Sequence, residues 1–146
     1  MIRGVSEIVF YVDEIKVSSV ISFEGAFQRY IRNSVLEGAE VVVVLTNQAS
    51  YGESGMSDQF ILMSTANALS NDRPLIHSAI TGKSAIITNT GTISKISELF
   101  EATTLTDSVT PMNSLTLYTR FGNYLNYLVL IVSGLFFLKR FIRQSD

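Results

Sequence analysis

The sequence EVVVVLT, residues 40–46, decides the fold of this chain. It is a β-branched run in which polar and apolar residues do not alternate, the pattern typical of a central strand covered on both faces. We therefore expect it to form the core strand of a sheet. The flanking segments must then supply neighbouring strands and the helices that cover them.

The residues before this strand predict two further strands and a helix. Ile8–Val12 and Ile15–Ile21 are apolar runs separated by two acidic residues, which predicts a strand, a turn and a buried strand. From Glu24 to Leu36 apolar residues recur at helical spacing, and Gly38 stands where a helix C-terminus favours a left-handed residue. We expect this helix to pack on the sheet.

The residues after the core strand repeat the pattern and then change it. A polar loop covers residues 47–55, and Ser57 can cap a second helix that runs to about Leu69. Hairpin turns then join three short predicted strands, Leu75–Ala79, Ser84–Thr88 and Ile93–Leu99. Two helical crossovers followed by hairpins predict a layered α/β sheet.

An apolar run near the end of the chain, Phe121–Leu138 (FGNYLNYLVLIVSGLFFL), contains no charged residue. As a helix, about 18 residues cover about 27 Å, close to the hydrocarbon thickness of a bilayer, about 30 Å. We therefore predict one transmembrane helix. A buried core helix is the alternative, because Asn126, Ser133 and Gly134 dilute the run.

Basic residues predict the orientation of this helix. Lys139, Arg140 and Arg143 follow the run, whereas Arg120 alone precedes it closely, so the positive-inside rule places the C-terminus in the cytoplasm and residues 1–120 outside. The first residues offer no apolar core of signal-peptide length. We therefore expect one of two situations: earlier membrane spans are missing from the start of a plasma-membrane protein, or the domain stays cytoplasmic and the tail inserts against its charge bias. This tension indicates a fragment.

Composition excludes several classes of function. The net charge is −2, and the basic residues are scattered, so there is no basic surface for nucleic acid. The chain has no cysteine and only one histidine, His77, which excludes disulfides, thiolate metal sites and multi-histidine metal sites. We predict no metal, no cofactor and no nucleic-acid partner.

A buried strand gives way to a helix at Ser22, an elbow that suits a nucleophile. The segment VISFE at this elbow, residues 20–24, resembles the carbon-nitrogen hydrolase (nitrilase) superfamily, and within it the apolipoprotein N-acyltransferases. Further family-like motifs follow in the same order: Gly38-Ala39, NQASYGES at 47–54, Arg73-Pro74, Thr81-Gly82 and LTLYTRFG at 115–122.

The resemblance implies the fold and the reaction. It implies the C-terminal portion of a nitrilase-like layered α-β-β-α sandwich, followed by one transmembrane helix. The family moves an acyl chain from a phospholipid to the N-terminal amine of a lipoprotein through a cysteine thioester, assisted by a Glu base and a Lys. The family cysteine aligns with Ser22, and the Glu and Lys, which lie upstream in the family, have no counterpart in this sequence.

The resemblance also implies the site residues. Ser22 takes the nucleophile position and Glu24 a second carboxylate position, while Phe23, Asn47 and Tyr51 fall where the family binds substrate. Three of these residues have a structural alternative: Glu24 suits a first helical turn, Asn47 a turn, and Tyr51 the closing of a core. We assign no catalytic role to His77.

We divide the chain into a partial nitrilase-like domain at 1–120, a transmembrane helix at 121–138 and a basic cytoplasmic tail at 139–146. A serine without a positioned base stays protonated, so we expect the chain to be inactive alone. Three hypotheses follow: an N-acyltransferase completed by a separate N-terminal half, a non-catalytic membrane-anchored binding module, and a decaying gene fragment. With only two helices available, we expect one sheet face to remain apolar and exposed.

Overall fold

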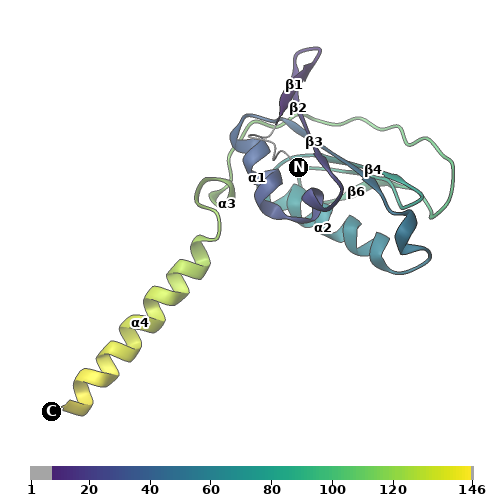
Figure 1. The fold of residues 1–146 in the computed structure, drawn as a ribbon. Helices are drawn as coiled ribbons and strands as arrows, with labels where there is room; N and C mark the ends of the chain where they lie inside the picture. The colour runs from purple at the N-terminus through teal and green to yellow at the C-terminus, as the bar shows by residue number, and fades with distance from the viewer. Residues whose placement is uncertain (1–7, 146) are drawn as a thin grey trace, which may run out of the picture.

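Six strands form one mixed sheet in their order along the sequence, in a computed structural model that describes residues 8–145. Residues 1–7 of the predicted domain, and Asp146 of the predicted tail, lie outside the described residues. The sheet and its helices form one body, and a long C-terminal helix extends away from it (Figure 1).

The core strand predicted at residues 40–46 is confirmed as β3, which lies inside the sheet between two parallel neighbours. β2 and β4 run parallel to β3, whereas β1, β5 and β6 pair antiparallel. The strands are β1 (Val9–Val12), β2 (Ile15–Ile21), β3 (Val41–Asn47), β4 (Leu75–Ile80), β5 (Ala85–Ile87) and β6 (Ile93–Ile96). The layered α/β sheet predicted from two crossovers and two hairpins is thus present.

Two helical crossovers join the parallel strands, as parallel pairing requires. The first consists of a 3₁₀ turn, η1 (Ser22–Ala26), and helix α1 (Gln28–Leu36); the second consists of η2 (Ala49–Tyr51) and α2 (Met56–Asn71). The single helix predicted over Glu24–Leu36 is wrong at its start, because Phe27 is extended, with φ −97° and ψ 115°. The elbow is therefore a separate short turn.

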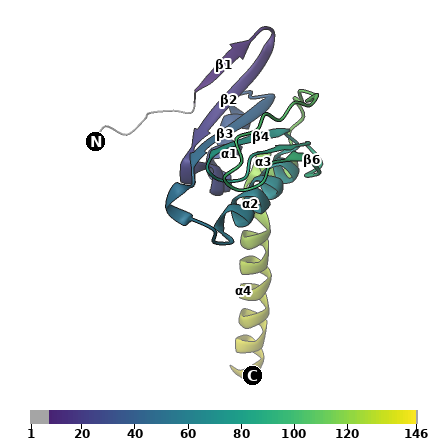
Figure 2. The same ribbon diagram turned by 90° about the vertical axis from the view of Figure 1, so that its right-hand side faces the viewer.

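Both crossover helices cover the same face of the sheet (Figure 2). On this face, β2 and β3 place their register partners Val20 and Val44. Ile31 of α1 and Ile61 of α2 join them in one buried cluster. This cluster is the core, and burying these apolar side chains is the main force that holds the helices to the sheet.

The opposite face of the sheet is partly uncovered. Ile21 and Leu45 are register partners there, and they are 64% and 45% exposed. Ile80, two residues beyond the partner of Leu45, is 66% exposed. The expected exposed apolar face is therefore present at this end of the sheet only, and the cover on both faces of β3 inferred from EVVVVLT is wrong at the Leu45 end.

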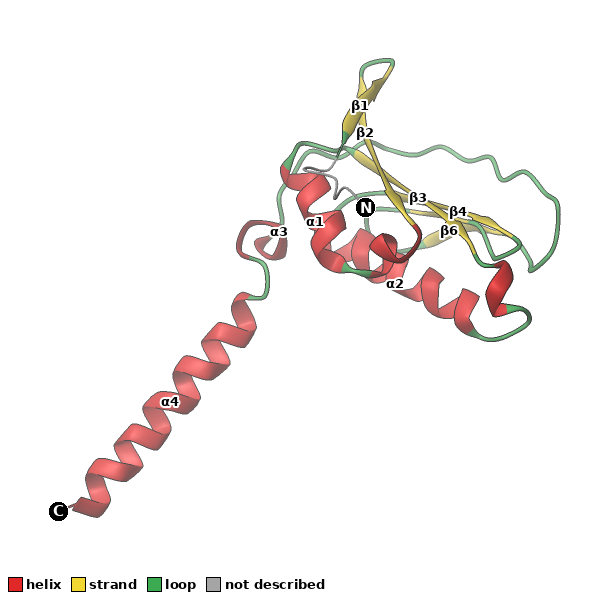
Figure 3. Ribbon diagram, viewed as in Figure 1, coloured by secondary structure: helices red, strands yellow, loops and turns green. Residues whose placement is uncertain are grey.

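A long segment without helix or strand connects β6 to the C-terminal helices (Figure 3). It passes the start of β3, where the Met112 backbone N–H donates to the Glu40 carbonyl at 3.2 Å. Val41 beside this contact is buried. The uncovered part of the sheet face is therefore the part near the carboxyl ends of the parallel strands.

The C-terminal part of the chain forms two helices, α3 (Leu117–Phe121) and α4 (Tyr124–Ser145), separated at Gly122 with φ +63°. Over the part of the chain that the structure describes, no helix is long and apolar enough to cross a membrane. The transmembrane helix predicted at 121–138 is therefore unsupported. Polar residues interrupt the run, and α4 continues through the boundary predicted at 138.

Candidate functional site

The carboxyl ends of β2, β3 and β4 meet at one edge of the sheet, where Ser22, Gln48 and Thr81 follow the strands directly. In α/β sheets this edge is where ligands bind. Ser22 and Thr81 both have positive φ, +55° and +65°. Such conformations cost non-glycine residues of order 1–3 kcal/mol each and cluster at functional sites. We therefore take this edge as the candidate site.

Ser22 begins the elbow turn and is half-buried. Within residues 8–145 its hydroxyl has no hydrogen-bond partner. Glu24, predicted as a second catalytic carboxylate, accepts a hydrogen bond from the Ile21 backbone N–H through Oε2 at 2.9 Å. This bond caps the elbow turn, so the carboxylate is engaged with the backbone and not with the serine.

The elbow is held tightly against β3. A Cβ added to Gly25 would lie 2.5 Å from Val44 Cγ1, so only glycine allows this approach. On the other side, Asn67 Nδ2 of α2 donates to the Gly25 carbonyl at 2.9 Å. The segment that carries Ser22 is thus fixed between the sheet and α2.

Three aromatic rings meet beside Ser22, and we call Phe23, Tyr51 and Phe60 the aromatic cluster. The Phe23 and Phe60 ring centroids are 5.3 Å apart, and Tyr51 lies 6.5 Å from Phe23 and 6.0 Å from Phe60. Phe60 is buried, whereas Phe23 is half exposed. The structure brings together Phe23 and Tyr51, both predicted to bind substrate, and adds Phe60. Phe60 could not be predicted, because in the sequence it is one apolar residue among several in a helix.

Asn47, the remaining residue predicted to bind substrate, has a local role. Its Oδ1 accepts a hydrogen bond from the Ala49 backbone N–H at 3.0 Å, the geometry of an Asx turn that opens η2. This bond supports the structural alternative given for Asn47. The side chain lies at the same strand edge as Ser22, because β2 and β3 are parallel neighbours.

Beneath the aromatic cluster lies a buried polar group that sequence reasoning missed. His77 Nε2 is 3.4 Å from Gln48 Nε2, and its Nδ1 is 2.9 Å from Ser64 Oγ. Burial lowers the pKa of His77 to about 4, so the ring is neutral at physiological pH.

The β4–β5 turn lies against this polar group at Gly82. A side chain on Gly82 would overlap the Gln48 amide, so the glycine of the β4–β5 turn is required there.

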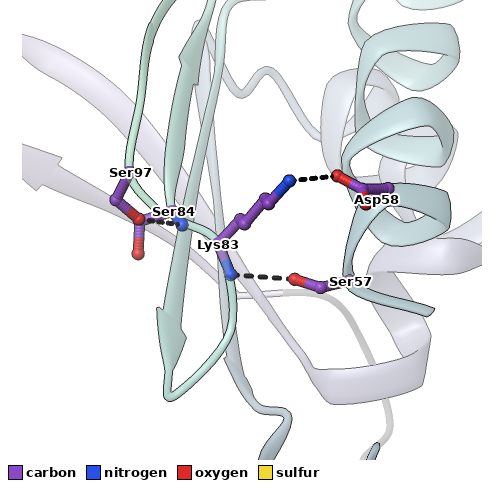
Figure 4. Close-up of polar contacts among 5 residues, drawn as sticks. All are labelled: Ser57, Asp58, Lys83, Ser84 and Ser97. Carbon is purple, nitrogen blue, oxygen red and sulfur yellow. Dashed lines mark hydrogen bonds and ion pairs between the residues drawn. The ribbon is translucent and has the colours of Figure 1, made fainter. Parts of the chain in front are cut away.

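The β4–β5 turn is fastened to the start of α2 (Figure 4). The Lys83 backbone N–H donates to Ser57 Oγ at 2.8 Å, and Lys83 Nζ forms an ion pair with Asp58 Oδ1 at 2.6 Å. Beside it, the Ser84 N–H donates to Ser97 Oγ at 2.8 Å. Ser57 is therefore not the predicted helix cap: the N-cap is Gly55, and the hydroxyl serves the turn instead.

Comparison with known proteins identifies the class. The profile of the carbon-nitrogen hydrolase family matches residues 3–113. The chain therefore belongs to the carbon-nitrogen hydrolase family. Within it, the chain is 32% identical over 108 residues to an apolipoprotein N-acyltransferase of Photobacterium profundum, covering 74% of this chain and 21% of that protein. It is also 32% identical over 145 residues to one of Rickettsia bellii, covering 93% and 28%.

Solved structures show the same fold. An amidase of the nitrilase superfamily from Nesterenkonia AN1 matches with a TM-score of 0.57 at 17% identity, covering 66% of this chain and 39% of that one. A carbon-nitrogen hydrolase from Helicobacter pylori G27 matches with a TM-score of 0.58 at 12% identity, covering 66% and 41%. The chain thus has a nitrilase-like α/β fold. It spans about two fifths of the length of these two structures, and 21% and 28% of the two N-acyltransferases.

Proposed function

We propose that this chain acts as part of an apolipoprotein N-acyltransferase-like protein, with the strand edge at Ser22 facing a lipid acyl chain. The observation that carries the proposal is the placement of Ser22 on a strained elbow, φ +55°, beside the aromatic cluster. An exposed ring such as Phe23, backed by a buried one such as Phe60, provides an apolar surface for a hydrocarbon chain.

The chain alone does not carry out acyl transfer in this proposal. Attack on an ester carbonyl requires the Ser22 hydroxyl to lose its proton as the new ester bond forms. Glu24 is engaged with the Ile21 backbone N–H, and His77 is bonded to Gln48 and Ser64. Without a base aligned on it, a serine hydroxyl remains a weak nucleophile.

Partners would supply what is missing. We propose a phospholipid as acyl donor, the N-terminal amine of a lipoprotein as acceptor, and a separate N-terminal half that brings a Glu base and a Lys. The uncovered sheet face at Ile21, Leu45 and Ile80 supports a second layer that would complete the α-β-β-α sandwich.

We also propose that α4 lies against membrane lipid. Its apolar side chains are exposed along the helix, among them Leu128, Leu130, Ile131 and Leu135, which are 53% to 68% exposed. The helix extends away from the body (Figure 1). Flotation of the full chain with phospholipid vesicles tests this, and Leu130→Lys combined with Ile131→Lys should reduce the floated fraction.

Mass spectrometry of the intact chain tests the chemistry. After incubation with phospholipid micelles, the unmodified chain should show no added acyl mass. Ser22→Cys should take one acyl group from a reactive thioester without turnover, because a thiol is partly ionised unaided. Ser78→Cys, exposed on the uncovered sheet face, is the matched control for non-specific acylation. An acyl group found on Ser22 itself would contradict the proposal.

A non-catalytic binding module is the second candidate, and the half-exposed Phe23 ring of the aromatic cluster, beside a Ser22 that has no aligned base, favours it. Binding of a fatty acid that Phe23→Ala weakens, in a chain that never acylates even with an added N-terminal half, would select this candidate. A decaying gene fragment would instead show no protease-resistant body.

A further inference from the structure

A line of buried hydrogen bonds connects the Ser22 elbow with α3 at the base of the C-terminal helix. Asn67 Nδ2 donates to the Gly25 backbone carbonyl at 2.9 Å, and Asn71 Nδ2 donates to the Asn67 backbone carbonyl at 3.0 Å. Thr119 Oγ1 then donates to Asn71 Oδ1 at 3.1 Å. Asn67, Asn71 and Thr119 are each 0% exposed. The line therefore runs from η1 across α2 to α3 without contact with solvent.

The far end of this line is anchored independently. Arg32 of α1 donates through Nε to the Tyr118 carbonyl at 3.3 Å and through Nη2 to the Arg120 carbonyl at 3.2 Å. Thr116 Oγ1 donates to the Ser70 carbonyl at 2.7 Å. Because α4 begins at Tyr124, shortly after the end of α3, docking of α3 also places the base of α4.

Asn67 is a costly residue at its position. Its Oδ1 is buried without a hydrogen-bond partner among the described residues, which destabilises the fold. Turning the amide over would not help, because Oδ1 would then face the Gly25 carbonyl oxygen. An apolar residue would avoid this cost, so the donation from Nδ2 to the elbow is the interaction that explains an asparagine here.

We propose that Asn67, Asn71 and Thr119 are positioning residues that make the geometry of residue 22 depend on the docking of α3. When α3 is seated, Thr119 orients the Asn71 amide, Asn71 holds the Asn67 turn of α2, and Asn67 holds the elbow. The proposal rests on the proposed function in taking residue 22 as the reactive position, and it assigns a device by which the C-terminal helices set that position.

Ser22→Cys makes the test direct, because the natural chain has no cysteine. In the full chain carrying this substitution, we would measure the alkylation rate of the thiol by iodoacetamide as a function of pH. Hydrogen exchange of the backbone N–H groups of residues 22–27 would be measured beside it. The comparison is between Thr119→Val, which removes the hydroxyl from the line, and Thr65→Val. Thr65 Oγ1 donates to the Ile61 carbonyl at 2.9 Å within α2, the helix that carries Asn67 and Asn71, but it takes no part in the line.

We expect Thr119→Val to change the alkylation rate of the introduced thiol at least about twofold and to shift its pH profile, with faster exchange at 22–27. Thr65→Val should leave the alkylation rate, its pH profile and the exchange rates unchanged. Thr119→Ser keeps the hydroxyl and should give the same values as the parent chain. Asn67→Ala combined with Thr119→Val should change the rate by less than the product of the single effects, since both break one line.

A folded Thr119→Val chain with the parent's alkylation profile and exchange rates would overturn the proposal. Should Thr119→Val not fold, Arg32→Gln loosens α3 from the surface side, and an unchanged profile in that variant overturns it equally. Alkylation involves no acyl group, so these outcomes are independent of whether the proposed acyltransferase function holds.

Discussion

Gln48 and His77 meet under the candidate site with their Nε2 atoms 3.4 Å apart, and both side chains are almost fully buried. Gln48 follows β3, and His77 lies within β4, which pairs with β3 in parallel register. Ser64 of α2 closes the group from the helix side. The side chains buried under the candidate site are therefore polar and uncharged at neutral pH. Their net charge changes only when the His77 ring is protonated.

We expect stability to depend on pH through His77. It is the only histidine, and burial lowers its pKa to about 4 in the folded chain, against about 6.5 when unfolded. The unfolded chain thus binds a proton first as pH falls. The free energy of unfolding is therefore unaffected by His77 above pH 6.5. As the pH falls from 6.5 to about 4, protonation of the unfolded chain lowers it progressively, by about 3 kcal/mol in total.

Urea unfolding between pH 5 and 7 measures this dependence above the range in which most carboxylates titrate. His77→Gln should be less stable at pH 7 but should lose the slope over this range. An equal slope in the parent and in His77→Gln would show that other groups cause it.

Gly25→Ala should destabilise the chain by about 1–3 kcal/mol, because the new Cβ would lie 2.5 Å from Val44 Cγ1 in a packed core. Gly55→Ala is the matched control, since nothing lies within 4 Å of a Cβ there and φ is −67°. Thermal unfolding followed by circular dichroism compares the two. Equal midpoints would mean that the elbow is free to move away from β3.

At the β4–β5 turn, Ser57→Ala should cost more stability than Asp58→Asn. Ser57 is buried, and its loss leaves the Lys83 backbone N–H without its partner, at about 1–3 kcal/mol. The Asp58 carboxylate is 57% exposed, so its ion pair with Lys83 contributes little and is screened by salt. Unfolding at low and high salt distinguishes them, and a larger effect of Asp58→Asn would reverse this ranking.

The strands could be predicted from sequence because apolar runs between turn residues carry their own signal. β2 matches its predicted bounds, and β3 is displaced by one residue. The break at Phe27 could not be predicted in the same way. It follows from the approach of Gly25 to Val44 and from the Asn67 bond, which are contacts between residues distant in sequence.

The candidate site could be predicted only in part. Motifs in the sequence mark Ser22, Phe23 and Tyr51, and the structure places the rings of Phe23 and Tyr51 6.5 Å apart. Gln48 and Ser64 have no local pattern that marks them, because their role exists only once β4 brings His77 between them. Glu24 illustrates the opposite case: a motif position whose carboxylate is engaged with the backbone.

Ser22→Gly should stabilise the chain by up to about 1 kcal/mol, whereas Ser22→Ala should not. The φ of +55° is strained for any residue with a Cβ and is freely adopted by glycine. Chemical denaturation of both variants measures the difference. If Ser22→Ala matched Ser22→Gly, backbone strain at the elbow would be negligible.

The uncovered sheet face should drive association of the chain with itself when no other partner is present. Ile21 and Leu45 face solvent side by side, with Ile80 close by at the same edge, and exposed apolar surface of this kind favours association. In detergent that covers α4, light scattering on the full chain should give a mass above that of a monomer. Leu45→Lys should lower this mass by placing a charge in the contact. Leu69→Lys, on the exposed side of α2, should leave it unchanged. A monodisperse parent monomer that unfolds in one sharp transition would show that this face needs no cover.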